Sequence, residues 1–231
     1  MFETATDIGD SSVLRGENNR DSKSDVDMFK IRPAYDGAYK IIVTGGIQVF
    51  DENGVQKKSH PATFVNGPAY DLEAGKAYFI RVESSTMVNN YVADKIYEIK
   101  IQDPFDATKE YGVETLSLSH SSIPSTGYLS GFGATFNERH PIAYYKAYRT
   151  PSTVSIKALK VSLSSSGSAT SIEIYNEAKV LIGQSALGED GKQTVWVNVG
   201  KDQVVYTKVV NETPGVLGYF FHLGFLNSLI E

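Results

Sequence analysis

A pair of carboxylates comes first among the few residues of this chain that could carry chemistry. Asp25 and Asp27 stand one residue apart, immediately before a stretch in which apolar and charged residues alternate. Carboxylates in such a place can offer oxygen atoms to a hard cation. They can instead accept hydrogen bonds from backbone N–H groups at the start of a strand. The spacing alone is compatible with both roles.

The remaining reactive side chains indicate no catalytic site. No Gly-x-Ser-x-Gly elbow, Walker A loop or dinucleotide fingerprint is present, and the chain has no cysteine. The four histidines are scattered, and none has a second histidine or an acid at metal-ligand spacing on a shared strand: His60, His120, His140 and His222. We therefore expect that the protein is not an enzyme and has no catalytic residues.

The single tryptophan is the candidate ligand-binding residue. Trp196 stands between Val195 and Val197, so in a strand its indole points to the face opposite the two valines. If the valines belong to the core, the indole is exposed, and exposed aromatic rings stack on sugars or peptide surfaces. The alternative is that a loop or a neighbouring domain covers the ring.

Composition and charge exclude several classes of protein. The chain is 41% hydrophobic and 21% charged, which is ordinary for a globular protein. A net charge of -5 and the lack of a basic tract argue against a nucleic-acid partner. No apolar run approaches the ~18 residues that span a bilayer, so we expect no membrane insertion. Residues 1–12 have neither the basic nor the apolar region of a signal peptide.

The periodic segments of the chain predict strands. Val, Ile, Thr, Ser and Tyr dominate them, and turn signals recur roughly every 8–12 residues, as in β-sandwiches. Asn53-Gly54 is typical of a tight hairpin turn. Alternation is clearest in five segments, 29–32, 39–43, 47–50, 77–82 and 96–101. No amphipathic helix pattern is found, and we predict an all-β protein.

Two blocks of sequence recur at a common spacing. Residues 172–177 are similar to 47–52, and residues 197–201 are similar to 72–76. The offset is the same in both, because 172 − 47 and 200 − 75 both equal 125. Two separate blocks with one offset indicate an internal duplication.

The duplication predicts the domain organisation. We expect two tandem jelly-roll-like β-sandwich domains, residues 1–102 and 113–231, joined by a linker at 103–112. Alternate residues of each strand should point into a core between two sheets. Ile80, flanked by Tyr78 and Val82, should lie in the first of these cores.

Two shorter similarities extend the repeat. Residues 145–148 match 29–32, and residues 113–115 match 2–4. The Ser- and Gly-rich residues 116–143 between them are predicted to form a loop.

The first half of the chain resembles a known family. An Asp-x-Asp pair leads into two strands over 25–43, and a strand ends in Asp-Glu-Asn-Gly over 47–54. A Leu-Glu-Ala-Gly-Lys-Ala-Tyr turn follows at 72–78, with a closing strand at 96–101. In this order the elements resemble the bacterial pre-peptidase C-terminal domain, a family that includes the collagen-binding domains of clostridial collagenases. The second half lacks the Asp-x-Asp pair and resembles the family through its similarity to the first.

The resemblance implies a jelly-roll-like sandwich that serves as a non-catalytic appendage of secreted bacterial proteins. Some members bind calcium near the N-terminal edge through acids of the lead-in segment and of the Asp-x-Asp pair. The matching positions here are Asp25 and Asp27, with Glu3 as a third candidate. Calcium takes roughly 6–8 oxygen ligands. Other acids of the lead-in segment could contribute oxygens: Asp7, Asp10, Glu17 and Asp21.

Two classes of function fit these features. The first is a binding or spacer module of a bacterial extracellular or cell-surface protein, which holds a polysaccharide or protein surface. The second is a structural subunit of a phage particle, such as a tail, fibre or head-decoration protein, which would assemble as a homo-oligomer. Met1 and the lack of a signal peptide favour the second, and the family resemblance favours the first. A segment of a larger adhesin or protease is a third hypothesis.

Overall fold

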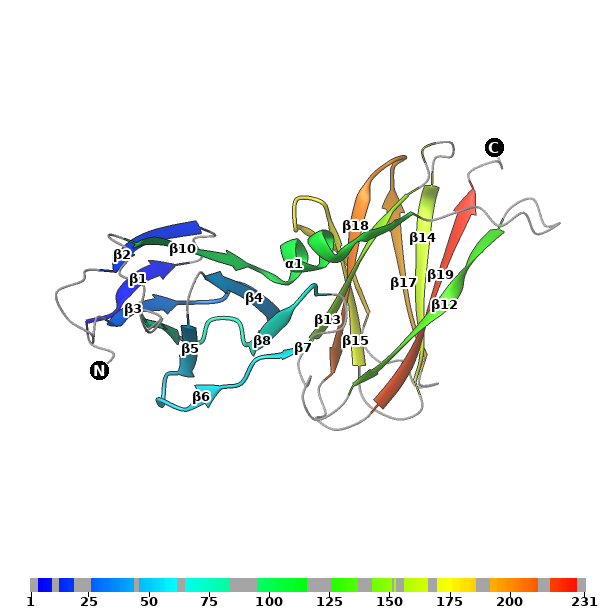
Figure 1. Ribbon diagram of the computed structural model, residues 1–231. Coiled ribbons are helices and arrows are strands. Elements are labelled where there is room, and N and C mark those ends of the chain that lie inside the picture. Colours follow the sequence, from blue (N-terminus) through cyan, green and yellow to red (C-terminus); the bar gives the residue numbers. More distant parts are fainter. Residues whose placement is uncertain are drawn as a thin grey trace. The chain divides into compact units, whose positions relative to one another are not determined.

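The fold is all-β, as the alternating sequence pattern predicts (Figure 1). Strands make up nearly all the regular structure of the described residues and pair into the sheets of sandwich-like units. The chain divides into two compact units, Met1–Ala107 and Thr108–Glu231. The computed structural model describes residues 4–9, 13–18, 26–43, 46–61, 65–83, 95–115, 126–136, 143–150, 152, 156–165, 170–185, 192–211 and 217–227.

The first unit contains two five-stranded sheets. In spatial order, one sheet consists of β1 (Thr6–Gly9), β3 (Val26–Ile31), β9 (Tyr78–Glu83), β5 (Gly46–Asp51) and β6 (Gln56–Lys57). The other consists of β2 (Val13–Asn18), β10 (Lys95–Gln102), β4 (Gly37–Val43), β8 (Pro68–Leu72) and β7 (His60–Pro61). β1 runs parallel to β3, whereas β9 is antiparallel to both of its neighbours.

Alternate side chains of these strands form the core of the first unit. Ile80 on β9 is fully buried, and so are Tyr78 and Val82 on either side of it, which confirms the predicted row. Ile80 lies opposite Phe29 on β3 and Val49 on β5. The central strand therefore sets the register of both of its neighbours.

Replacing Ile80 by alanine should lower the free energy of unfolding by ~2–5 kcal/mol, because a fully buried side chain leaves a cavity. Urea unfolding of the full chain measures this change. Ile42→Ala is the matched control, since Ile42 on β4 is exposed, and its effect should stay within about 0.5 kcal/mol. Equal effects of the two substitutions would contradict the register.

Hydrogen bonds join two turns of the first unit. The Gly75 N–H donates to the Pro33 carbonyl at 2.9 Å, and the Ala74 N–H donates to the Asp36 carboxylate at 2.7 Å. The buried Tyr78 hydroxyl accepts a hydrogen bond of 3.0 Å from a backbone N–H of the same turn. Gly75 has a φ of +76°, in the region that favours glycine. The Leu-Glu-Ala-Gly-Lys-Ala-Tyr stretch is therefore a turn motif with a structural role.

The second unit repeats the strand order of the first. Its five-stranded sheet consists of β11 (Val113–Thr115), β13 (Ala143–Arg149), β18 (Val204–Asn211), β15 (Thr170–Asn176) and β16 (Leu181–Ser185). Its four-stranded sheet consists of β12 (Thr126–Phe136), β19 (Leu217–Asn227), β14 (Ile156–Ser165) and β17 (Lys192–Val199). β11 is parallel to β13, just as β1 is parallel to β3.

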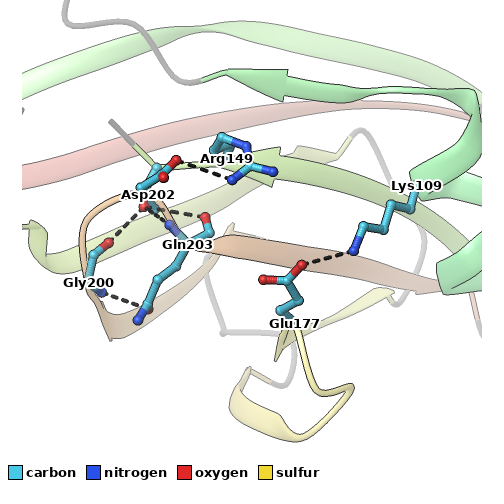
Figure 2. A network of polar contacts seen from close by, with 7 residues as sticks. Lys109, Arg149, Glu177, Gly200, Asp202 and Gln203 are labelled. Carbon is cyan, nitrogen blue, oxygen red and sulfur yellow. Dashed lines mark hydrogen bonds and ion pairs between the residues drawn. The ribbon is translucent and has the colours of Figure 1, made fainter. Parts of the chain in front are cut away.

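The turn-to-turn link also recurs in the second unit, with different side chains (Figure 2). The Thr150 hydroxyl donates to the Gly200 carbonyl at 2.7 Å and accepts from the Gln203 N–H at 2.9 Å. The Gly200 N–H donates to the Gln203 side chain at 2.9 Å. Arg149 and Asp202 add an ion pair of 3.2 Å at the same end of the sheet. This polar network joins two turns of the second unit.

The hairpin turns show the repeat in atomic detail. In the first unit the Asp51 carboxylate accepts hydrogen bonds from the N–H groups of Asn53 and Val55, at 2.9 and 2.8 Å. In the second unit the Asn176 side chain accepts one from the Val180 N–H at 2.9 Å. The offset is again 125, because 176 − 51 and 180 − 55 have that value. Both copies use a side-chain oxygen to close the same turn.

The two hairpins differ at one strained position. Gly54 has a φ of +79°, and its counterpart Lys179 has a φ of +61°. This region costs a residue with a Cβ roughly 1–2 kcal/mol. Lys179→Gly should therefore stabilise the second unit by roughly 0.5–1 kcal/mol after the extra freedom of glycine in the unfolded chain is deducted. Thermal melting measures this gain. Lys179→Ala loses the same side chain but keeps the Cβ, and a variant as stable as Lys179→Gly would contradict the explanation.

The expected linker at 103–112 contains a helix, α1 (Pro104–Tyr111), so the expectation of no helix is wrong here. The Asp103 carboxylate accepts a hydrogen bond from the Asp106 N–H at 2.9 Å, as an N-cap does, and proline suits the first helical position. Gly112 follows the last turn with a φ of +152°. Lys109 in that turn forms an ion pair of 2.9 Å with Glu177 (Figure 2). No helix in the described part of the chain is long and apolar enough to cross a membrane.

The predicted loop at 116–143 is also wrong in part. β12 runs through its centre and pairs with β19 in antiparallel register. A register shift lies between Leu129 and Phe132, at the glycine of that segment. Glycine and serine are poor strand formers on their own, but a partner strand supplies the backbone hydrogen bonds that hold them.

The strand registers correct the alignment of the repeat before the central strand. Ile80 lies opposite Val49, and Thr207 lies opposite Ile174, which is 125 residues after Val49. Phe29 is the other neighbour of Ile80, and Lys146 is the other neighbour of Thr207, so Lys146 is the counterpart of Phe29. The similarity that placed Tyr145 there is wrong by one residue.

The neighbouring strand shifts in the same way. Gly9 on β1 lies opposite Ile31, and Glu114 on β11 lies opposite Tyr148, the counterpart of Ile31. Glu114 is therefore the counterpart of Gly9 and not of Glu3.

Candidate functional site

β17 of the second unit separates a buried row from an exposed aromatic side chain. Val195, Val197 and Val199 are buried, whereas Trp196 is 52% exposed. This confirms that the indole points away from the valines. The valine row lies against the backbone of Gly183 on β16, where an added Cβ would come within 2.3 Å of Val197. The valines therefore face the core, and Trp196 lies on the outer face of its sheet.

The register places a row of residues across this sheet at the level of Trp196. Lys160 on β14 lies opposite Trp196, and Gly224 on β19 lies opposite Lys160. Tyr128 on β12 lies opposite Gly224. Residues that are paired across neighbouring strands belong to one face of a sheet. The row therefore runs from Trp196 on the edge strand β17 to Tyr128 on the opposite edge.

The adjoining row on one side is apolar, since Ala158 lies opposite Leu226, whereas polar residues lie on the other side. Thr194 lies opposite Ser162, and Ser162 lies opposite His222. Lys192 lies opposite Ser164. Hydroxyl groups both donate and accept hydrogen bonds. The outer face thus combines an exposed indole with residue types that hydrogen-bond to polar ligands.

The charge of the four-stranded sheet differs from that of the chain. Its four described strands contain no Asp, Glu or Arg. Lysine is their only fully charged residue type, at Lys157, Lys160 and Lys192. The whole chain has a net charge of -5. Lys160 and Lys192 are in register with the face of Trp196, whereas Lys157 lies at a register shift.

The structure describes the candidate calcium ligands in part. Asp27 is half-buried on β3, opposite Val82. Glu3 and Asp25 lie outside the described residues. Within the described ranges, no group of three His, Asp or Glu side chains could hold a metal ion. A calcium site at Asp25, Asp27 and Glu3 stays a prediction.

Asp7 has a local role instead. Its carboxylate accepts a hydrogen bond from the Gly9 N–H at 3.1 Å, which lowers the pKa of Asp7. The Lys30 Nζ lies 3.5 Å from the other carboxylate oxygen. The remaining acids of the lead-in segment lie outside the described residues or are described in backbone alone: Asp10, Asp21 and Glu17.

The second unit has a tyrosine in the place of Asp27. Val82 lies opposite Ile47, and Val209 lies opposite Ile172, which is 125 residues after Ile47. Asp27 is the other neighbour of Val82, and Tyr144 is the other neighbour of Val209. The calcium prediction therefore concerns the first unit.

Calcium added to protein pre-treated with EGTA should raise the melting temperature, and Asp27→Ala should abolish the rise. Binding to the native state alone adds RT ln(1 + [L]/Kd), which is ~4 kcal/mol for millimolar calcium at a micromolar site. Glu52→Ala, which removes an exposed acid of the same unit, is the control and should keep the full shift. If the wild-type protein does not respond, Asp27 has a structural role only.

A histidine and an acid that are distant in the sequence meet in the first unit. Nε2 of His60 on β7 lies 2.9 Å from Oδ2 of Asp71 on β8, and both side chains are largely buried. His60 is paired with Ala69, so Asp71 is its diagonal neighbour across the strands. A search for acids on the same strand as a histidine cannot find this pair, because its two residues lie on different strands. It links the short edge strand β7 to the sheet.

A second buried polar group lies on the five-stranded sheet of the second unit. Lys208 Nζ is 3.1 Å from Oε2 of Glu173, its cross-strand neighbour. The Tyr175 hydroxyl donates to the same oxygen at 2.5 Å. The opposite charges and the hydroxyl satisfy one another, as buried charges require.

Comparison with known proteins identifies no family. No protein-family model and no curated protein matches the sequence. Among solved structures, the periplasmic inhibitor of g-type lysozyme from Aeromonas hydrophila is 10% identical and matches 50% of this chain and 97% of that chain, with a TM-score of 0.31. The insecticidal crystal protein Cry2Aa is 9% identical over 83% of this chain and 50% of that chain, with a TM-score of 0.30. The CUB1-EGF-CUB2 region of rat MASP-1 is 9% identical over 96% and 99%, with a TM-score of 0.25.

Similarities of this size carry no argument about function. The resemblance of residues 25–101 to pre-peptidase C-terminal domains stays a prediction.

Proposed function

We propose that this chain is a non-catalytic binding module that holds a polymer or protein surface on the outer face of the four-stranded sheet of its second unit. The observation that carries the proposal is the 52% exposure of Trp196 on a sheet whose opposite face is core. Tryptophan is among the residues most enriched at binding hot spots. Its large, rigid ring provides contact area at a low cost in conformational entropy.

The surroundings of Trp196 support this role. The ring is carried by a strand and not by a loop, so its position is well defined before a ligand arrives. Val195 and Val197 anchor that strand in the core on either side of the ring. Serine and threonine occupy the rows of the face on one side of Trp196. Such a face suits an extended ligand that lies across several strands.

We place this module outside the bacterial cell, on a secreted or surface protein. The support is the resemblance of residues 25–101 to pre-peptidase C-terminal domains. A calcium site at Asp25, Asp27 and Glu3 would suit that setting, because calcium is abundant outside cells. The first unit would then act as a calcium-stabilised spacer beside the binding unit.

Co-sedimentation with insoluble polymers tests the proposal. The panel comprises fibrillar collagen, cellulose, chitin and peptidoglycan. We expect at least one polymer to retain the protein, and Trp196→Ala to raise the Kd roughly tenfold or more, since loss of a hot-spot tryptophan costs at least ~2 kcal/mol.

Leu181→Ala is the matched control, because Leu181 is an exposed apolar residue on the other sheet of the same unit. It should bind like the wild-type protein. Equal retention of Trp196→Ala, or retention by no polymer of this panel or of the soluble acidic polysaccharides considered below, would contradict the proposal.

A further inference from the structure

We infer that the ligand of the Trp196 face is an acidic polysaccharide, whose sugar rings stack on the indole while the lysines of β14 and β17 balance its negative charge. This inference deepens the proposed function and rests on it.

The four-stranded sheet of the second unit has an unusual content of charged residues. Its strands have 11, 10, 8 and 11 residues, and the chain average of 27 acids in 231 residues would place about two acids in the half of them that faces outward. They contain none, but they contain three lysines. An anionic ligand meets no fixed negative charge on these strands. Its approach to the face is therefore favoured although the chain as a whole is acidic.

The equivalent sheet of the first unit differs in its charged residues. The equivalent sheet, formed by β2, β10, β4 and β8 with β7, carries three acids in its strands, Glu17, Glu98 and Asp71, together with four cations, Arg15, Lys40, Lys95 and Lys100. The two sheets share strand order. The lack of acids is thus a property of the second unit and not of the fold. The lack of acids is not explained by a need for solubility, because acids promote solubility more than lysines do.

The row that contains Trp196 combines aromatic and charged residue types. Lys160 is its direct cross-strand neighbour, and Gly224 and Tyr128 continue the row. Neighbouring strands lie about 4.8 Å apart, so a row of four strands extends about 14 Å. An aromatic residue stands at each end, with a lysine and a glycine between them. This order of residue types suits a chain of rings that carries a charge at intervals.

The residue types of the four strands favour a polysaccharide over other polyanions. Recognition of phosphate relies strongly on the planar fork of arginine, and the four described strands have no arginine. Duplex DNA carries one charge per ~1.7 Å, a density that three lysines do not match. The hydroxyl groups of Ser162, Ser164 and Thr194 suit a ligand that is itself rich in hydroxyl groups. These features favour a sugar polymer with widely spaced acids.

The experiment uses matched polymers that differ in charge alone. Polygalacturonate is compared with its methyl-esterified form, and carboxymethyl cellulose with hydroxyethyl cellulose. Trp196 is the only tryptophan of the chain, so its fluorescence reports on this face directly. We expect the acidic member of a pair to shift the emission to the blue and to protect the indole from acrylamide quenching, with a Kd at least tenfold lower than that of the neutral member. Added NaCl should weaken this binding, because exposed charges are screened.

Two substitutions separate stacking from charge. Trp196→Ala should abolish binding to the acidic polymers in affinity electrophoresis. Lys160→Gln should reduce the preference for the acidic member of a pair several-fold. Lys201→Gln removes the same charge from an exposed turn of the same unit and should leave the preference unchanged.

Three outcomes would overturn the inference. Equal binding of acidic and neutral members, lost in Trp196→Ala, would remove the charge preference and leave the proposed function standing. Retention by the insoluble panel without binding of any acidic polysaccharide would have the same consequence. Binding of duplex DNA or of vesicles of equal parts phosphatidylglycerol and phosphatidylcholine, as tight as that of polygalacturonate and independent of Trp196, would show general attraction of polyanions.

Discussion

The buried valine row of β17 is the constraint on which the proposed site depends. Val195, Val197 and Val199 are withdrawn from water, and each contributes roughly 1.5–3 kcal/mol by its burial. A slip of one residue in the pairing of β17 would expose all three and bury the indole of Trp196. The close approach of Gly183 adds a steric reason, because no side chain fits between that backbone and Val197. The exposure of Trp196 therefore follows from the packing of the residues behind it.

The two units show which parts of the repeat are held by backbone geometry and which parts have been free to change. The joined turns persist, although Asp36 and Tyr78 serve in one copy, and Thr150 and Gln203 in the other. Backbone N–H and C=O groups at these turns need partners, but several side chains can supply them. No such requirement acts on the outer face of a sheet. The four described strands of the second unit's sheet contain no acid, and the proposed anionic ligand would account for this composition.

The sequence predicts this fold well where residues alternate over a whole strand. The buried row around Ile80 and the outward position of Trp196 follow from a period of two and need no tertiary information. The helix at Pro104–Tyr111 is missed because eight residues give too short a period, although Asp103 and Gly112 are ordinary boundary signals. β12 is missed because its glycines and serines have low strand propensity, and the partner strand β19 that holds it lies about 90 residues later in the chain.

The candidate site, like the fold, is predicted from the sequence only in part. The sequence indicates that Trp196 faces away from the core, but it does not indicate that the ring is uncovered or that Lys160, Gly224 and Tyr128 lie in its row. That arrangement depends on the register of four strands from distant parts of the chain. His60 and Asp71 are hidden for the same reason, since diagonal neighbours cannot be recognised before two strands are paired. In a β-protein, sites that cross strands become visible only through the pairing.

A sheet face with an exposed indole is a weak site for a small molecule and a suitable one for a polymer. A stacked aromatic ring and a few solvent-exposed charges contribute only a few kcal/mol, because surface charges are screened and each ordered side chain loses entropy. A single sugar would dissociate readily from such a face. A polymer presents the same ring and the same charge at every repeat, so a departing segment is replaced by its neighbour at high local concentration. The modest strength of each contact is therefore compatible with firm attachment, provided that the ligand repeats along its length.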